Sequence, residues 1–173
     1  MFISIAGAVA LVAGCTAIGF YFAAKEGFRV RDLQEFKKAL QILSSEIEHM
    51  RAPLPTACIN ISKRTTRHVS ELFLNFSQLL EANDGETAYQ LWAQVIESQK
   101  PHAHLADEDW DVFDGFGKTL GYLDKHMQQS AITYAIEYID EKTASLLTQA
   151  DKDKRMYRSL GIISGLLLAI VLW

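Results

Sequence analysis

Gly117-Lys118-Thr119 matches the end of a nucleotide-binding P-loop, in which backbone N–H groups cradle phosphates and the lysine reaches the outer ones. Such a loop needs a glycine five positions before Gly117, where this chain has Val112. It also follows a buried apolar strand, whereas residues 107–111 read Asp-Glu-Asp-Trp-Asp. The pattern therefore argues against ATP hydrolysis, and the glycines need another explanation.

Two other groups contain residue types that could bind a metal ion or act as a nucleophile, but their spacing does not support such a site. His102, His104 and Asp107 are near neighbours in a polar loop, with no defined fourth ligand and no rigid support for a metal ion. Cys58 has no histidine at a telling spacing and is typical of a small core residue. We therefore expect no catalytic residue, no metal site and no cofactor, and interpret the chain as non-enzymatic.

The N-terminal stretch is apolar and has no charged side chain from Phe2 to Ala24. A helix of this length, at about 1.5 Å per residue, crosses a hydrocarbon core of about 30 Å, so residues 1–24 are expected to form a transmembrane helix. Val12 to Cys15 resembles a lipoprotein processing site, which leaves lipidation of Cys15 as an alternative. The absence of basic residues before the apolar run favours a retained helix.

The C-terminal run, Leu160–Trp173, is also apolar but spans only about 21 Å as a helix. It becomes long enough if Met156 and Tyr157 extend it and Arg158 reaches up to the head groups. We expect residues 159–173 to form a second transmembrane helix, with a membrane-inserted hairpin end as the alternative.

The basic residues predict the orientation of the chain. They cluster at the two ends of residues 25–158, and the positive-inside bias then places this part in the cytoplasm and both termini outside. A net charge of −4 without a basic arm argues against binding to nucleic acid. The clusters comprise Lys25, Arg29, Arg31, Lys37 and Lys38 at one end, and Lys152, Lys154, Arg155 and Arg158 at the other.

Apolar residues between the two spans recur at helical spacing, which predicts an antiparallel bundle of about six helices and no strand. Breaks at Pro53, at 83–85 and near Pro101 separate the first four helices. Their stripes are Leu33, Phe36, Leu40, Leu43, Ile47 and Met50; Cys58, Ile59 and Ile61; Val69, Leu72, Phe73, Phe76, Leu79 and Leu80; and Ala88, Leu91, Trp92, Val95 and Ile96.

A fifth helix is predicted to begin at Asp107, which can cap it, with further acidic residues favourable to its positive end. Gly117 and Gly121 lie four residues apart on this expected helix, after an apolar stripe from Trp110. Glycine in a helix interior costs about 1 kcal/mol, so the pair indicates that another backbone packs closely there. The alternative is a loose helix end before Asp124.

From Asp124 the chain has no proline and no glycine until Gly161, which predicts one helix that continues into the second span. The residues expected to face the bundle are Met127, Ala131, Tyr134, Tyr138 and Leu146. Small residues recur every four positions in both spans and indicate close packing of helices, within one chain or in a homo-oligomer. They are Gly161, Gly165 and Ala169 in the second span and Ala6, Ala10 and Gly14 in the first.

Four motifs in matching order give the chain a family resemblance over nearly its whole length. They are Ala39-Leu40-Gln41 with Glu46-Ile47; Pro53-Leu54-Pro55-Thr56-Ala57; Phe116 to Gly121 with Asp124 and Gln128-Gln129; and Met156 to Gly161 with Gly165-Leu166-Leu167-Leu168. With two apolar ends at matching places, they resemble the stage III sporulation protein AB family. The Trp173 ending and the run from Val12 to Cys15 depart from that pattern.

The resemblance implies a component of the channel complex between mother cell and forespore, in the mother-cell membrane facing the forespore. It also implies a cytoplasmic domain similar to F-type platform proteins of type II secretion and type IV pilus machines, which contact a cytoplasmic ATPase. The expected partners are then that ATPase and other stage III sporulation proteins. The acidic residues expected to contact partners are Glu46, Glu48, Asp107, Glu108 and Asp109. A membrane-anchored receptor or assembly regulator without motor contact is the alternative.

Overall fold

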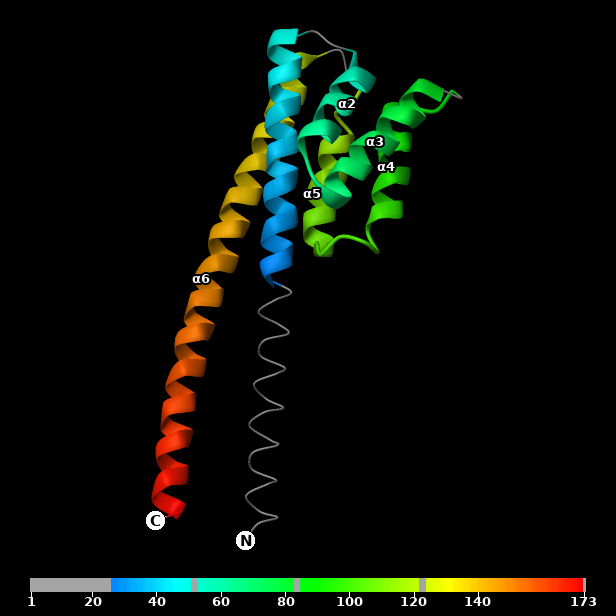
Figure 1. Cartoon of the computed structure of the whole chain (residues 1–173). Coiled ribbons are helices and arrows are strands. Elements are labelled where there is room, and N and C mark those ends of the chain that lie inside the picture. The colour runs from blue at the N-terminus through cyan, green and yellow to red at the C-terminus, as the bar shows by residue number, and fades with distance from the viewer. Residues whose placement is uncertain (1–25, 51–52, 83–84, 122–123, 173) are drawn as a thin grey trace. The chain divides into compact units, whose positions relative to one another are not determined.

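The structure is a computed structural model that describes residues 26–50, 53–82, 85–121 and 124–172 (Figure 1). These residues form helices joined by short connections, and they contain no strand, which confirms the all-α prediction for this part of the chain. The helices are the first helix over residues 26–45, which continues into the π-helical turn η1 (Glu46–Met50); α2 (Leu54–Arg64); α3 (Arg67–Ala82); α4 (Ala88–Gln99); α5 (Asp107–Gly117); and α6 (Lys125–Leu172).

The chain divides into two units, which are considered separately. The first, the bundle, is Phe28–Glu141, and the second consists of the two chain ends, Met1–Gly27 and Lys142–Trp173. The compact bundle ends at Glu141, and the boundary of the soluble domain at Arg158, where polarity changes, stays a prediction. The predicted first span, including Cys15, lies outside the described residues.

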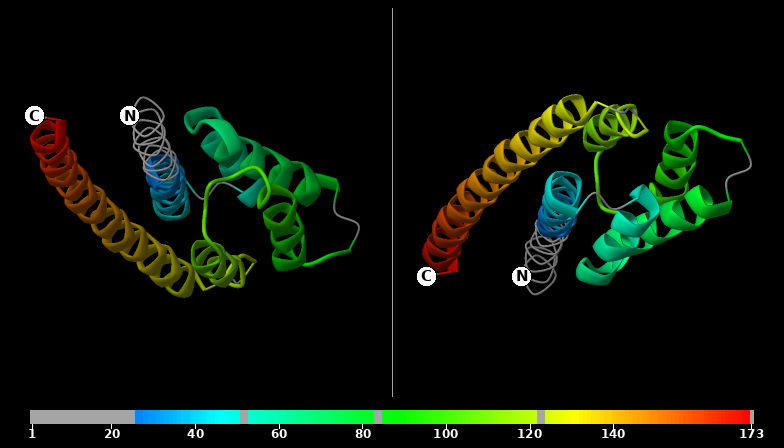
Figure 2. Two further views of the ribbon diagram at one scale, coloured as in Figure 1. Left: turned by 90° about the horizontal axis from the view of Figure 1, so that it is seen from below. Right: turned by 90° about the horizontal axis from the view of Figure 1, so that it is seen from above.

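The first helix is buried along the stripe that the sequence predicts. Leu33, Phe36, Leu40 and Leu43 are almost fully buried, because steps of three and four residues return to one face of a helix. The Phe36 ring stacks on the Phe113 ring at 4.1 Å between centroids, which brings α5 against the first helix. In both views of Figure 2 this helix is flanked by the start of α6 on one side and by α2 on the other.

The connections between helices follow the chemistry of their sequences. Pro53 precedes α2 and Pro55 lies in its first turn, where a missing N–H costs nothing. Thr87 begins α4 with a capping box, since its hydroxyl accepts from the Gln90 N–H and the Gln90 side chain accepts from the Thr87 N–H. The predicted break at Pro53 is confirmed, and the capping box of Thr87 fixes the start of α4.

Trp92 on α4 is the aromatic centre of the bundle. Its ring makes edge contacts with Phe76 of α3 and Phe116 of α5, at 5.1 and 5.5 Å between centroids. Its Nε1–H donates to the Phe113 carbonyl at 2.9 Å, so the buried indole is satisfied. One side chain thereby joins α3, α4 and α5.

The long helix predicted from Asp124 onward is confirmed, since α6 runs from Lys125 to Leu172. Its predicted inward stripe is partly right, since the Tyr138 hydroxyl donates to the buried Asp109, but the most buried residues lie one position further along. Ile132, Ala135 and Ile139 are buried, whereas Met127 and Tyr134 are 50% and 64% exposed. The predicted and the observed stripes have apolar residues at the same spacing. The observed stripe is aliphatic and has no polar side-chain atom that would need a hydrogen bond, so it is the one buried in the core.

Within the part of the chain that the structure describes, no helix is both long and apolar enough to cross a membrane. The surroundings of Gly161 and Gly165 belong to the part of α6 whose side chains are outside the description.

Candidate functional site

The Gly117-Lys118-Thr119 stretch ends a helix, whereas the corresponding residues of a P-loop begin one. Lys118 follows the last residue of α5, and its Nζ lies 3.0 Å from Asp114 Oδ2 and 5.8 Å from the centre of the Tyr89 ring. The bond to Asp114 raises the pKa of Lys118. Lys118 is thus engaged in a local ion pair one turn from its partner.

Gly117 is a close-packing position, but its neighbour is an aromatic ring and not a backbone. A Cβ atom at this position would lie 2.0 Å from Trp92 Cδ1. Gly121 does not share the helix, as the sequence suggested, because α5 ends at Gly117. Gly121 lies in the following turn with φ +92°, a conformation that favours glycine. The alternative of a helix end therefore holds for Gly121.

Asp109 is the centre of a buried polar cluster. Its side chain is fully buried, and its two oxygens accept from Arg29 Nε and Nη2 at 2.8 and 2.9 Å. Oδ1 also accepts from the Tyr138 hydroxyl at 2.8 Å, and Oδ2 accepts from the Ala106 N–H at 2.9 Å. The polar cluster, defined as Arg29, Glu108, Asp109 and Tyr138, joins the first helix, α5 and α6.

The electrostatics of the polar cluster favour the protonated forms of its two donors. The hydrogen bond to Asp109 is the main cause that raises the pKa of Arg29, although burial opposes it. Burial is the main cause that raises the pKa of Tyr138, and the hydrogen bond to Asp109 adds to it. Glu108 accepts from Arg29 Nη2 at 2.8 Å but remains half exposed. The cluster therefore works as an internal clamp.

This geometry corrects two predictions about the start of α5. Ala106, and not Asp107, is the capping position, and Asp109 satisfies the Ala106 N–H from the third position of the helix. Asp109 is also unavailable to a partner protein, because it is fully buried. No local pattern indicated that Arg29, eighty positions away, would bind this carboxylate.

Glu46 is a second predicted contact residue that the structure buries. It is 4% exposed at the start of η1, and its Oε1 accepts from Asn60 Nδ2 at 3.1 Å. Its Oε2 is buried without a hydrogen-bond partner in the described part of the chain. Glu46 thus links the first helix to α2, whereas Glu48, Asp107 and Glu108 remain exposed.

The histidines of the loop before α5 have separate partners. The His104 N–H donates to Asp32 Oδ2 at 2.9 Å, and its Nδ1 lies 3.5 Å from the same oxygen. The His102 ring faces the His68 ring at 6.4 Å. No three potential ligands converge on one point among the described residues.

Cys58 lies in the core of the bundle. It is fully buried on α2, and burial raises the pKa of its thiol to about 12. Because the thiolate is the nucleophile, a thiol with this pKa is unreactive near neutral pH.

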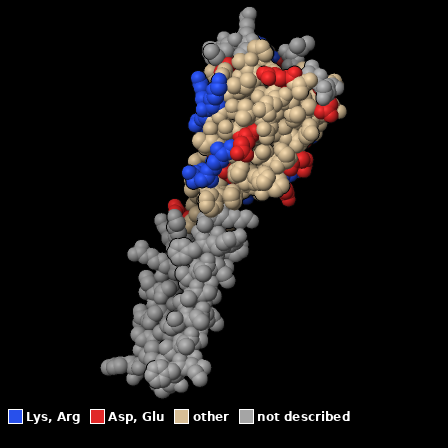
Figure 3. Space-filling model, turned by 45° about the vertical axis from the view of Figure 1, so that its right-hand side comes forward, with Lys and Arg blue, Asp and Glu red and all other residues tan. Residues whose placement is uncertain are grey.

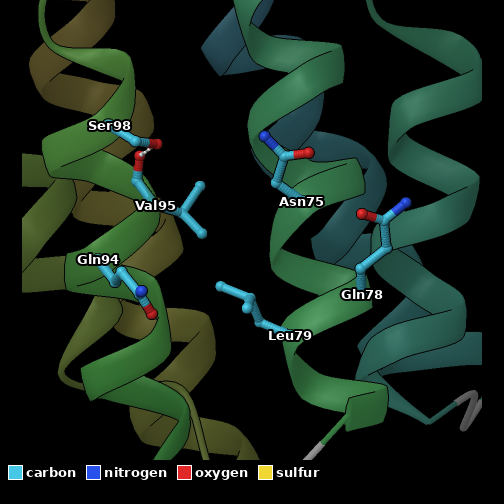
Figure 4. A pocket seen from close by; sticks show the side chains of 6 residues that line it. All are labelled: Asn75, Gln78, Leu79, Gln94, Val95 and Ser98. Carbon is cyan, nitrogen blue, oxygen red and sulfur yellow. Dashed lines mark hydrogen bonds between the residues drawn. The ribbon is translucent and has the colours of Figure 1, made fainter.

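A shallow groove lies between α3 and α4 (Figure 4). Its volume is about 260 Å³, and no charged residue lines it. Leu79 and Val95 point toward each other across its floor, between polar side chains of the two helices. The lining residues are Asn75, Gln78, Leu79, Gln94, Val95 and Ser98.

Charged side chains are distributed differently by sign on the face that Figure 3 shows. Lysine and arginine side chains gather along one edge of the described part, whereas acidic side chains lie at separate places. The face shown therefore carries charges of both signs.

The described residues thus form an all-α bundle. Of the acidic residues predicted to contact partners, some connect helices inside the bundle and the others are exposed to solvent. The chain belongs to the stage III sporulation protein AB family, whose pattern matches residues 4–173. This confirms the resemblance and gives the chain a role in sporulation. That family is known as a sporulation component and not as an enzyme.

Two relatives support the family membership. Stage III sporulation protein AB of Bacillus subtilis (strain 168) is 33% identical over 166 residues, which are 96% of either chain. A solved structure of stage III sporulation protein AB (SpoIIIAB) is similar with a TM-score of 0.67 and 30% identity. The similarity covers 72% of this chain and 97% of the solved one.

Proposed function

We propose that this chain is a non-enzymatic platform of the sporulation channel between mother cell and forespore. It holds the bundle at the mother-cell membrane and docks a cytoplasmic ATPase and other channel subunits. The observation that carries the proposal is the family membership over residues 4–173. Nucleotide hydrolysis then belongs to the ATPase, in keeping with the place of Lys118 at the end of a helix.

Membrane anchoring in this proposal rests on the sequence. The apolar stretches at 2–24 and 160–173 form the two spans, and the basic residues that flank them place the bundle in the cytoplasm with both termini outside. Small residues in the spans, among them Gly161 and Gly165, pack helices against each other or against neighbouring subunits.

The internal geometry of the bundle suits a platform that transmits force. The polar cluster connects the helix that follows the first span to α6, the helix that leads to the second. Arg29 makes three hydrogen bonds in this cluster, and Lys37 Nζ pairs with Asp140 at 2.5 Å between the same two helices. A load applied to one helix is therefore shared by the other.

Docking through charge uses the acidic residues that remain exposed: Glu48, Asp107 and Glu108. Reversal of the charge of Glu48 and Asp107 to lysine is expected to weaken binding of the ATPase without unfolding the bundle, since both side chains face solvent. The matched control is Glu71→Lys with Glu81→Lys, two exposed acidic residues of α3. The measurement is capture of the ATPase by the tagged full chain from sporulating cells.

Equal capture by the reversed chain and its control would mean that docking does not use these two side chains. Capture of a different cytoplasmic protein, without the ATPase, would favour the alternative of a receptor or assembly regulator.

A further inference from the structure

Three segments that are distant in the sequence meet at one end of the bundle. The Phe28 ring stacks on the His104 ring at 4.9 Å, which places the loop before α5 beside the start of the first helix. The His102 ring of this loop faces the His68 ring in the first turn of α3, at 6.4 Å. The turn between α2 and α3 therefore lies at the same end as Phe28.

This turn carries three exposed cations, Lys63, Arg64 and Arg67, which we call the basic turn. No acidic side chain of the described residues forms an ion pair with them. The acidic residues at this end have cations of their own: Glu108 pairs with Arg29, and Asp107 and Asp111 lie close enough to Lys100 to raise its pKa. The basic turn therefore carries positive charge that no acidic side chain of the described residues neutralises through an ion pair.

The first helix shows at what level of the bundle the basic turn lies. The Thr66 N–H donates to Glu35 Oε2 at 2.9 Å, so the turn is level with Glu35. Glu35 lies nine positions after Glu26, where the described helix begins, or about 14 Å along that helix. The long side chains of the basic turn shorten this gap, and the remainder is comparable to a Debye length of about 8 Å at physiological salt.

We propose that the basic turn binds the anionic head groups of the membrane in which the first span is anchored. The proposal rests on the membrane anchoring of the proposed function. Head groups with negative charge attract lysine and arginine within a Debye length of the surface. Such a contact fixes the tilt of the bundle on the membrane, so that its remaining faces stay open to protein partners.

The test uses the full chain in nanodiscs of phosphatidylcholine alone or with phosphatidylglycerol, and measures hydrogen exchange over residues 62–70. Phosphatidylglycerol is expected to slow exchange there by about fivefold or more, and high salt is expected to remove the effect. The double variant Lys63→Glu, Arg64→Glu loses the protection. The control Lys38→Glu, Lys125→Glu, an equal charge change at exposed positions outside the turn, retains it.

Equal exchange in both lipids, with the chain inserted in the discs, overturns the proposal and leaves the anchoring intact. Protection that persists in Lys63→Glu, Arg64→Glu also overturns it, because another surface then contacts the lipid. Failure of the chain to enter discs of either lipid overturns the anchoring and the proposal together.

Discussion

At the scale of single residues, some acidic side chains that the sequence predicted to lie on the surface are buried. Asp109 reads as one of several acidic residues in a helix start, yet it accepts four hydrogen bonds in the core. An acidic residue in the first turn of a helix has the same sequence signature whether it faces solvent or a buried arginine.

Asp109→Ala is expected to destabilise the bundle by about 3–5 kcal/mol, because it leaves Arg29 partly buried without its main partner. Glu108→Gln is the matched control and is expected to cost less than about 1 kcal/mol, since Glu108 is half exposed. Chemical denaturation followed by circular dichroism measures both. Similar losses for the two variants would contradict the role of Asp109 as the centre of the clamp.

Gly117→Ala is expected to cost about 1–3 kcal/mol, because the new methyl group collides with the Trp92 ring. A shift of this ring also endangers its bond to the Phe113 carbonyl. Gly115→Ala, two positions earlier on the same helix, has open space and is expected to stabilise by up to about 1 kcal/mol. The two melting temperatures must therefore move in opposite directions, and a shared direction would refute the packing described for Gly117.

Cys58 is expected to react slowly with a thiol reagent at pH 8 in the folded chain and rapidly in denaturant. Burial raises its pKa from 9.0 to about 12, so the thiolate is disfavoured only in the folded state. The associated stability is present below pH 9 and is lost as the pH rises toward 12. A Cys15→Ser background isolates the signal, and equal rates in folded and denatured chains would show that Cys58 is accessible.

At the scale of helices, sequence periodicity predicted which segments fold but not always which face is buried. The breaks at proline and glycine separate the helices correctly, since these residues act locally. On α6 two apolar stripes differ by one position. Which of them is buried depends on the surface of the first helix that packs against α6. A pattern within one helix carries no information about its neighbour.

The orientation of α6 predicts unequal effects of two truncations. Ile132→Ala is expected to cost about 2–4 kcal/mol, because Ile132 is 1% exposed, whereas Tyr134→Ala is expected to change stability by less than about 0.5 kcal/mol. Denaturant midpoints of the two variants measure the difference. A larger loss for Tyr134→Ala would restore the stripe that the sequence suggested.

Distant partners are the part of the fold that the sequence did not predict. Gln129 Nε2 donates to Ser44 Oγ at 2.6 Å and Lys37 pairs with Asp140, although each pair is separated by most of the bundle sequence. Neither pair has a local pattern, because any exposed helix carries similar side chains. Of the five acidic residues predicted to contact partners, Glu46 and Asp109 fail for this reason.

At the scale of the whole molecule, family membership gives a role in sporulation that no single side chain reveals. The bundle supplies rigid connections between the first helix and α6, and its exposed polar surface is available for docking. The proposed platform function unites these features, because a platform needs stable attachment on one side and recognition on the other.

The most direct test of the platform is the affinity of the purified sporulation ATPase for the full chain in nanodiscs, measured by biolayer interferometry against empty discs. The platform account predicts saturable binding that Glu48→Lys with Asp107→Lys weakens about tenfold or more, while Glu71→Lys with Glu81→Lys leaves it unchanged. No binding above that of empty discs, with the bundle shown to be folded and helical, would contradict the account.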